Sequence, residues 1–202
     1  GLPDDERYWK RIARKYYAVA DDYINLENGY YGIQPKPVLQ AFQNNIITAN
    51  EQAARFARKD YPAIAAAAKK ELAAFLEVSD EEIIITRNAT EALNIAIQGY
   101  PFKPGDEVLL NQLDYFSMIE TFNMLERRGQ IKVNAFEMPL LPQSDDEIVE
   151  QYRKLITART KVILLTHVSN INGLIIPVAK IAAMAKAKGI DTITDSAHAL
   201  GQ

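Results

Sequence analysis

The chain has 202 residues, of which 48% are hydrophobic and 24% are charged, so its apolar side chains can fill the core of one large domain or of one domain with an appendage. Its 23 basic and 26 acidic residues give a net charge of −3, which favours neither nucleic acid nor an anionic membrane as a partner. No apolar run approaches the roughly 20 residues of a membrane helix. Cysteine is absent, which excludes disulfides, thiolate metal sites and cysteine nucleophiles from this sequence.

No secretory signal is visible in the sequence, and we expect a cytoplasmic protein. The first residue is Gly1 rather than Met, so a cleaved export signal stays open as an alternative. The histidines His167 and His198 are too far apart for a metal-ligand motif, and no carboxylate pair has the spacing of a metal or glycosidase site. We therefore expect no metal.

The first part of the chain has a mainly helical pattern. Residues 4–19 form a charged amphipathic stretch, and residues 64–74 are rich in alanine, the best helix former. Residues 25–37 contain two glycines and two prolines, which predicts a structured loop. Residues 79–82, Ser-Asp-Glu-Glu, match a capping box and predict a further helical turn.

From residue 83 onward, short apolar runs alternate with helical patterns. The predicted strands are residues 83–86, 108–110, 131–136, 162–166 and 190–194. The predicted helices are residues 90–98, 117–127, 145–156 and 178–188. This alternation predicts an α/β fold built from right-handed βαβ units with a mainly parallel sheet. Ligands of such sheets bind beyond the carboxyl ends of the strands, so the residues just after each strand are the candidates for function.

The first strand-end segment is Arg-Asn-Ala-Thr-Glu at residues 87–91. The first amides of a helix have no intrahelical partners and lie at the positive end of the helix dipole, so they suit a phosphate, and the Thr90 hydroxyl would add a hydrogen bond. The alternative is an ordinary helix start, with Asn88 as the cap and Glu91 bonding back to it. By itself, the segment favours this alternative.

Three other strand ends carry polar or aromatic residues. Tyr115 would stack on a flat ring or serve as a core aromatic. Residues 167–173 are unusually polar, and they would bind a hydroxyl or carboxylate or serve only local turns. Asp195 ends an apolar strand, where a bare carboxylate is costly. A positively charged ligand would keep it ionised, and the alternatives are a helix N-terminus or His198.

Common nucleotide-binding and hydrolase motifs are missing from the sequence. No G-x-G-x-x-G follows a predicted strand, and there is no phosphate-binding P-loop lysine motif. No G-x-S-x-G nucleophile elbow is present. A nucleotide-binding α/β domain is therefore disfavoured.

Taken together, the strand-end segments resemble the class V aminotransferases and the cysteine desulfurases grouped with them. Residues 86–94 resemble the phosphate-binding turn of that family, residues 167–173 its asparagine loop and residues 195–198, Asp-Ser-Ala-His, its aspartate motif. Residues 25–29 resemble the branch that includes isopenicillin N epimerase-like proteins. The resemblance implies a fold type I PLP-dependent transferase. Residues 1–24 would be a helical N-terminal segment, and residues 25–202 would be the first part of the cofactor-binding large domain.

The resemblance also implies pyridoxal 5'-phosphate (PLP) as the cofactor. The residues that would bind it are Ala89, Thr90, Tyr115, Asn170, Asp195 and His198. The first two would hold the phosphate, Tyr115 would stack on the pyridine ring and Asn170 would face the ring hydroxyl. Asp195 would pair with the protonated ring nitrogen. His198 would lie near the ring hydroxyl or the link between cofactor and lysine, and Asn28 would contact the substrate.

The implied function is a PLP-dependent enzyme that acts on an amino acid by transamination, epimerisation or β-elimination, working as a homodimer. In the family, the Schiff-base lysine lies roughly 25 residues beyond the aspartate motif, so we expect it outside this segment and expect the segment alone to be inactive. Tyr115 replaces the histidine typical of the desulfurase branch, which weakens a desulfurase assignment. The alternative is a non-catalytic ligand-binding or scaffolding protein on the same fold.

Overall fold

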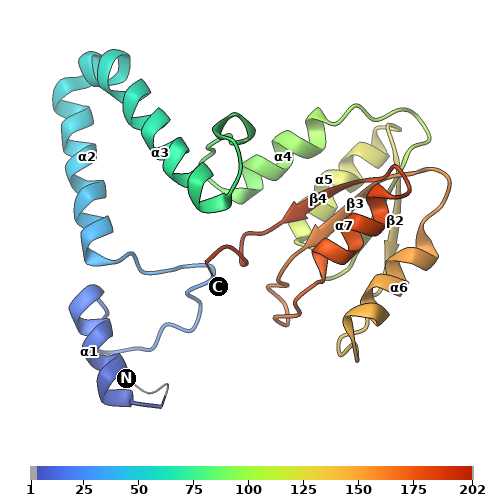
Figure 1. Cartoon of the computed structure of the whole chain (residues 1–202), viewed down its shortest axis with the longest axis horizontal. Helices are drawn as coiled ribbons and strands as arrows, with labels where there is room; N and C mark the ends of the chain where they lie inside the picture. The colour runs from blue at the N-terminus through green and yellow to red at the C-terminus, as the bar shows by residue number, and fades with distance from the viewer. Residues whose placement is uncertain (1–3, 202) are drawn as a thin grey trace. The chain divides into compact units, whose positions relative to one another are not determined.

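The computed structural model describes residues 4–201 (Figure 1). The chain divides into two compact units, Gly1–Ile85 and Thr86–Gln202. No helix among the described residues has both the length and the apolar character needed to cross a membrane. The division that the sequence suggests at residue 25 stays a prediction.

The first unit is helical, as predicted. Its elements are α1 (Glu6–Tyr16), α2 (Lys36–Arg55), the π-helical turn η1 (Phe56–Asp60), α3 (Tyr61–Leu76) and the 3-10 turn η2 (Asp80–Glu82). The end of α1 lies beside the start of α2, because Lys36 Nζ donates to the carbonyl oxygen of Arg14 at 2.7 Å and Tyr17 forms an isolated antiparallel bridge with Pro35.

The loop between α1 and α2 is structured by its own side chains. Asn25 Nδ2 donates to Asn28 Oδ1 at 3.1 Å and to the carbonyl oxygen of Tyr31 at 3.0 Å. Asn28 Nδ2 in turn donates to the carbonyl oxygen of Asn25 at 3.1 Å. A Cβ at Gly32 would lie 2.8 Å from the Asn28 carbonyl oxygen, so this turn requires glycine. The predicted loop is confirmed.

The predicted capping box is confirmed, but the strand predicted after it is wrong. Ser79 N donates to Glu82 Oε2 at 2.9 Å, and Ser79 Oγ accepts from Glu81 N at 3.3 Å. Residues 83–86 are extended without forming a strand. Ile84 is 78% exposed and Ile85 is 58% exposed. A strand needs a neighbouring strand to satisfy its backbone groups, and a β-branched pattern does not supply one.

The second unit is a parallel α/β domain. Its strands are β1 (Glu107–Asn111), β2 (Lys132–Phe136), β3 (Thr160–Thr166) and β4 (Asp191–Asp195). Its helices are α4 (Ala89–Gly99), α5 (Phe116–Arg127), α6 (Asp145–Leu155) and α7 (Val178–Lys186). The sheet has the order β2-β1-β3-β4, and each neighbouring pair is parallel. The prediction of an α/β fold with a mainly parallel sheet is confirmed.

Two hydrophobic clusters cover the two faces of this sheet. Alternate residues of β1 point to opposite faces, so Leu109 packs with residues of α6 and α7 while Val108 and Leu110 pack with residues of α4 and α5. The most buried side chains of the helices are Ile97, Met118, Phe122, Tyr152 and Ile181. Burial of the central strands on both faces explains why they read as continuous apolar runs in the sequence.

The helix predicted at residues 145–156 begins at Asp145, as predicted. The two aspartates at the start of α6 are its first helical residues rather than its caps. Ser144 is the cap, and its Oγ accepts from Glu147 N at 3.2 Å. Three acidic residues in the first turn favour the helix through its dipole.

Candidate functional site

The predicted site residues of the second unit lie at or near the carboxyl edge of the sheet. Because all four strands are parallel, the segments that follow them emerge at the same edge. Asp195 is the register partner of Thr166 at the ends of β4 and β3. Tyr115, just beyond β1, donates its backbone N–H to Thr166 Oγ1 at 3.3 Å. Tyr115 and Asp195 are thus anchored on either side of the end of β3.

Asp195 is a buried carboxylate with only 6% of its surface exposed. Its Oδ1 accepts from Ala197 N at 3.0 Å, a local turn that satisfies one oxygen. Within residues 4–201, no Lys or Arg forms an ion pair with Asp195. No side-chain oxygen of the described residues is both buried and without a partner, so the second oxygen of Asp195, Oδ2, reaches solvent. An open carboxylate oxygen on a largely buried side chain suits a cation or a hydrogen-bond donor of a ligand.

Tyr115 is half-buried and precedes the first residue of α5. Its ring centroid lies 5.1 Å from that of Phe116, with an interplanar angle of 67°. The backbone bond to Thr166 fixes the position from which the ring projects. An amphipathic ring at a sheet edge suits stacking on a flat ligand.

The loop after β3 is polar largely to satisfy its own backbone. Ser169 is buried, and its Oγ accepts from Ile171 N at 3.2 Å. Asn172 Oδ1 accepts from Leu174 N at 3.1 Å, which gives this residue a structural role that the sequence did not reveal. Asn170 lies exposed on the same loop. The local-turn interpretation therefore holds for Ser169 and Asn172.

The start of α4 combines both interpretations of residues 87–91. Asn88 caps the helix by accepting from Glu91 N at 2.9 Å, while Glu91 Oε2 accepts from Arg87 N at 3.0 Å. Ala89 and Thr90 are exposed, and among the described residues their backbone N–H groups have no acceptor. The ordinary helix start is present, and two amides are left for an anion.

The start of α4 lies at the carboxyl edge of the sheet. At the other end of the helix, the Tyr100 hydroxyl donates to Asp191 Oδ2 at 2.7 Å, and Asp191 is the first residue of β4. The helix runs antiparallel to β4 (Figure 1). Eleven residues at about 1.5 Å each span a length similar to that of the strand, so the first turn of α4 is level with the end of β4.

Sequence reasoning missed Asp114, a carboxylate that is 1% exposed at the end of β1. Its Oδ2 accepts from Asn111 N at 2.8 Å and from Asn111 Nδ2 at 3.1 Å, and its Oδ1 accepts from Thr166 N at 2.8 Å. Burial raises the pKa of Asp114 to about 7, the nearby charge of Asp195 adds to this, and the hydrogen bonds oppose it. The available signal was an Asn and an Asp three residues apart at a strand end.

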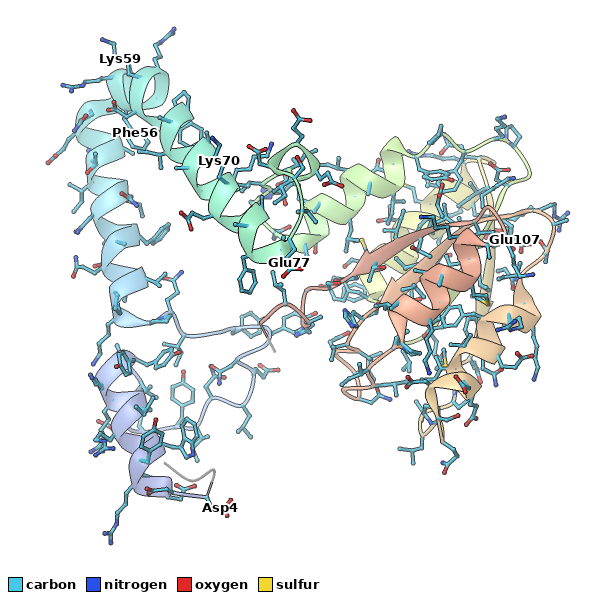
Figure 2. All side chains as sticks on the ribbon, in the orientation of Figure 1. Asp4, Phe56, Lys59, Lys70, Glu77 and Glu107 are labelled. Atoms are coloured by element: carbon cyan, nitrogen blue, oxygen red, sulfur yellow. The ribbon has the colours of Figure 1, made fainter. Side chains whose placement is uncertain are left out.

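A second buried carboxylate provides a contrast at the amino edge of the sheet. Glu107, labelled in Figure 2, is the first residue of β1. Its Oε1 accepts from the hydroxyls of Thr157 and Thr160, each at 3.1 Å, and its Oε2 lies 3.7 Å from Arg159 Nη2. Glu107 is therefore satisfied by the chain itself.

Comparison with known proteins places this geometry in a family. Residues 32–202 match the family model described as Aminotransferase class-V. The chain is 26% identical over 178 residues to isopenicillin N epimerase from Streptomyces clavuligerus, covering 88% of this chain and 45% of that protein. It is 31% identical over 138 residues to a cysteine desulfurase from Serratia proteamaculans, covering 66% of this chain and 33% of the relative.

Solved structures show the same fold. A C-DES mutant with glycine covalently linked to its PLP cofactor superposes with a TM-score of 0.77 at 22% identity, covering 98% of this chain and 50% of that one. The cysteine desulfurase CsdA from Escherichia coli superposes with a TM-score of 0.75 at 22% identity, covering 93% of this chain and 49% of that one.

The parallel sheet and its two helical layers have the fold of the large domain of fold type I PLP-dependent proteins, as the sequence predicts. The chain belongs to the class V aminotransferase family, and the resemblance drawn from its motifs is confirmed. Family membership implies PLP as the cofactor. The chain spans about half the length of the epimerases that it matches, 45% and 48%.

Proposed function

We propose that this chain is the first part of the cofactor-binding domain of a PLP-dependent enzyme that acts on an amino acid by transamination, epimerisation or β-elimination. The observation that carries the proposal is Asp195, a largely buried carboxylate at the end of β4 whose Oδ2 is open to a ligand. A protonated pyridine nitrogen supplies both the positive charge and the hydrogen-bond donor that this oxygen lacks.

The other residues fit the remaining parts of the same cofactor. The free first amides of α4 at Ala89 and Thr90 suit a phosphate, and the Thr90 hydroxyl adds a donor. Tyr115 supplies a half-buried ring on the opposite side of β3 from Asp195. Asn170 and His198 follow β3 and β4, from which they would reach the ring hydroxyl.

PLP supplies an electron sink for the electrons of a bond broken in an amino acid. Asp195 would hold a proton on the ring nitrogen, because the ion pair is worth more in a dry site than in water. Tyr115 would fix the plane of the ring, so that the bond to be broken stays aligned with it. The helix amides would anchor the phosphate and prevent the ring from turning.

The relatives include an epimerase and desulfurases, whose names indicate different reactions on this scaffold. Tyr115 stands where the desulfurase branch typically has a histidine, which argues against desulfurisation. Residues 25–29 resemble the epimerase-like branch. We therefore propose transamination, epimerisation or β-elimination as the candidate reactions.

We propose a homodimer for the full-length protein. On α2, Val38, Phe42 and Ile46 follow one another at intervals of four residues, and each is more than half exposed. This apolar stripe on one helix face is a surface that a second copy would cover. Asn28 lies in the ordered loop just before α2, where a substrate contact would be supported by its bonds to Asn25.

The test is a titration of the full-length protein with PLP, followed by its visible absorption after removal of free cofactor. We expect one cofactor per chain, retained through a covalent link that borohydride makes permanent. Retention of PLP without any covalent link would favour the non-catalytic alternative. Failure of the folded protein to bind PLP would contradict the proposal.

A further inference from the structure

We propose that Asp114 is a positioning residue, which joins the carboxyl ends of β1 and β3 and thereby holds Tyr115 in place against the cofactor ring. The inference rests on the proposed function, since it assumes that Tyr115 contacts PLP. The proposed cofactor contacts do not use Asp114.

The Asp114 carboxylate is held in a fixed position by its hydrogen bonds. One oxygen accepts from the backbone and side-chain N–H groups of Asn111, at 2.8 and 3.1 Å. The other accepts from Thr166 N at 2.8 Å, across to the end of β3. Because these partners belong to two strands, the carboxylate ties the strand ends together.

Tyr115 also forms a hydrogen bond to the end of β3. Tyr115 N donates to Thr166 Oγ1 at 3.3 Å, so Asp114 and Tyr115 contact the same residue of β3 through consecutive positions of one chain. The backbone N–H and the hydroxyl of Thr166 thus hold the segment that carries the ring at two points. Loss of the Asp114 contact would remove the shorter of these two bonds between the segment and Thr166.

The partners of the Asp114 carboxylate favour an acid at this position. The three groups that contact the Asp114 carboxylate are all donors. Asparagine at this position would place an NH₂ group against at least one donor, so it would lose a bond without changing the volume of the side chain. The site therefore requires an acid rather than a polar residue of the same shape.

Asp195 lies on the other side of Thr166 from Asp114. Thr166 is the register partner of Asp195, and His167 N donates to the Asp195 carbonyl oxygen at 2.8 Å. The end of β3 therefore connects the two residues proposed to contact the ring. A shift of this strand end would change the distance from the stacking residue to the ring-nitrogen partner.

The experiment uses the full-length protein and compares Asp114→Asn with Glu107→Gln, a matched buried acid at the amino end of the same strand. The readouts are the dissociation constant of PLP, the circular dichroism of the bound cofactor and the thermal midpoint of the apo-protein. We expect Asp114→Asn to weaken PLP binding by roughly tenfold and to change the cofactor dichroism. Glu107→Gln should lower only the thermal midpoint.

A double-mutant cycle with Tyr115→Ala tests whether Asp114 acts through Tyr115. If it does, Tyr115→Ala will weaken PLP binding much less in the Asp114→Asn background than in the wild type. Additive losses, or wild-type dichroism in Asp114→Asn, would overturn the inference. Thr166→Val removes the Thr166 hydroxyl and keeps its backbone N–H, so it should alter the dichroism of the bound cofactor. This variant serves even where Asp114→Asn does not fold. Unchanged dichroism in Thr166→Val would also overturn the inference.

The proposed function and this inference fail in different ways. If the wild type does not bind PLP, or Tyr115→Ala binds it as the wild type does, the stacking site itself is wrong. If the wild type binds PLP and Tyr115→Ala weakens binding, but the two substitutions are additive, only the role of Asp114 is wrong.

Discussion

At the scale of single residues, two buried carboxylates at the carboxyl edge of the sheet behave differently. Asp114 accepts three hydrogen bonds from the chain, while Asp195 accepts one and keeps an oxygen without a donor among the described residues. The apolar strand before Asp195 drew attention to it in the sequence. Asp114 could not be predicted in the same way, because its partner Thr166 is 52 residues away.

Replacement of Asp195 should affect turnover more than cofactor retention. Breaking a buried ion pair costs about 3–5 kcal/mol, so a similar loss from the transition state would lower turnover by roughly two to four powers of ten in Asp195→Ala. The measurement is turnover of an accepted amino acid by full-length protein saturated with PLP. Glu150→Ala, which removes only a surface ion pair with Arg153 on α6, is the control and should stay near wild type. Wild-type turnover in Asp195→Ala would show a structural carboxylate.

Asp114 should make the stability of the apo-protein depend on pH. Its pKa rises from 3.8 to about 7 on folding, so between these values the folded state binds more protons than the unfolded state. The free energy of unfolding should therefore fall as pH rises from about 4 to about 7 and then level off. Urea unfolding at several pH values should show this fall reduced in Asp114→Asn. An identical pH dependence in the two proteins would contradict the raised pKa.

At the scale of elements, the alternation of strands and helices from residue 107 onward could be predicted because each central strand is buried on both faces. The strand predicted at residues 83–86 failed because pairing depends on a neighbour that no local pattern specifies. The helix predicted from residue 145 begins there, but its cap is Ser144 rather than an aspartate, since serine and aspartate are equally good caps. Asn88 was predicted correctly as the cap of α4, but the Glu91 side chain accepts from Arg87 N rather than from Asn88.

The cap of α4 should matter for the cofactor as well as for the helix. Asn88→Ala removes the bond to Glu91 N, so it should cost about 1 kcal/mol and loosen the amides of Ala89 and Thr90. Ser144→Ala removes the equivalent cap of α6, and it should cost a similar amount with no effect on PLP affinity. Thermal unfolding and PLP titration of both variants are the measurements. If Asn88→Ala binds PLP with the same affinity as the wild type, the start of α4 does not hold the phosphate.

At the scale of the whole molecule, the helical unit carries exposed apolar side chains that its own residues do not cover. The exposed large side chains of α2 and α3 are Val38, Phe42, Ile46, Ile47, Tyr61, Ile64, Phe75 and Leu76. A surface of this kind is typical of a protein interface. We propose that a second copy of the chain covers this surface.

A charge within the apolar stripe should separate the proposed dimer. Phe42→Glu places a carboxylate where a second copy would bury an aromatic ring, so full-length protein should become monomeric at micromolar concentration. Asn44→Glu adds the same charge to an exposed position on the opposite face of the same helix and should leave the dimer intact. Light scattering distinguishes these results. A wild-type monomer, or a dimer that Phe42→Glu leaves unchanged, would contradict this interface.

The most direct test of the proposed site is a crystal structure of the full-length protein bound to PLP. We predict the phosphate at the amides of Ala89 and Thr90, the ring stacked on Tyr115 and the ring nitrogen donating to the Oδ2 atom of Asp195. This result would connect the open carboxylate oxygen of Asp195 to the chemistry of the cofactor. A ring nitrogen that faces water or another residue, with Asp195 left apart from the cofactor, would contradict the proposed site.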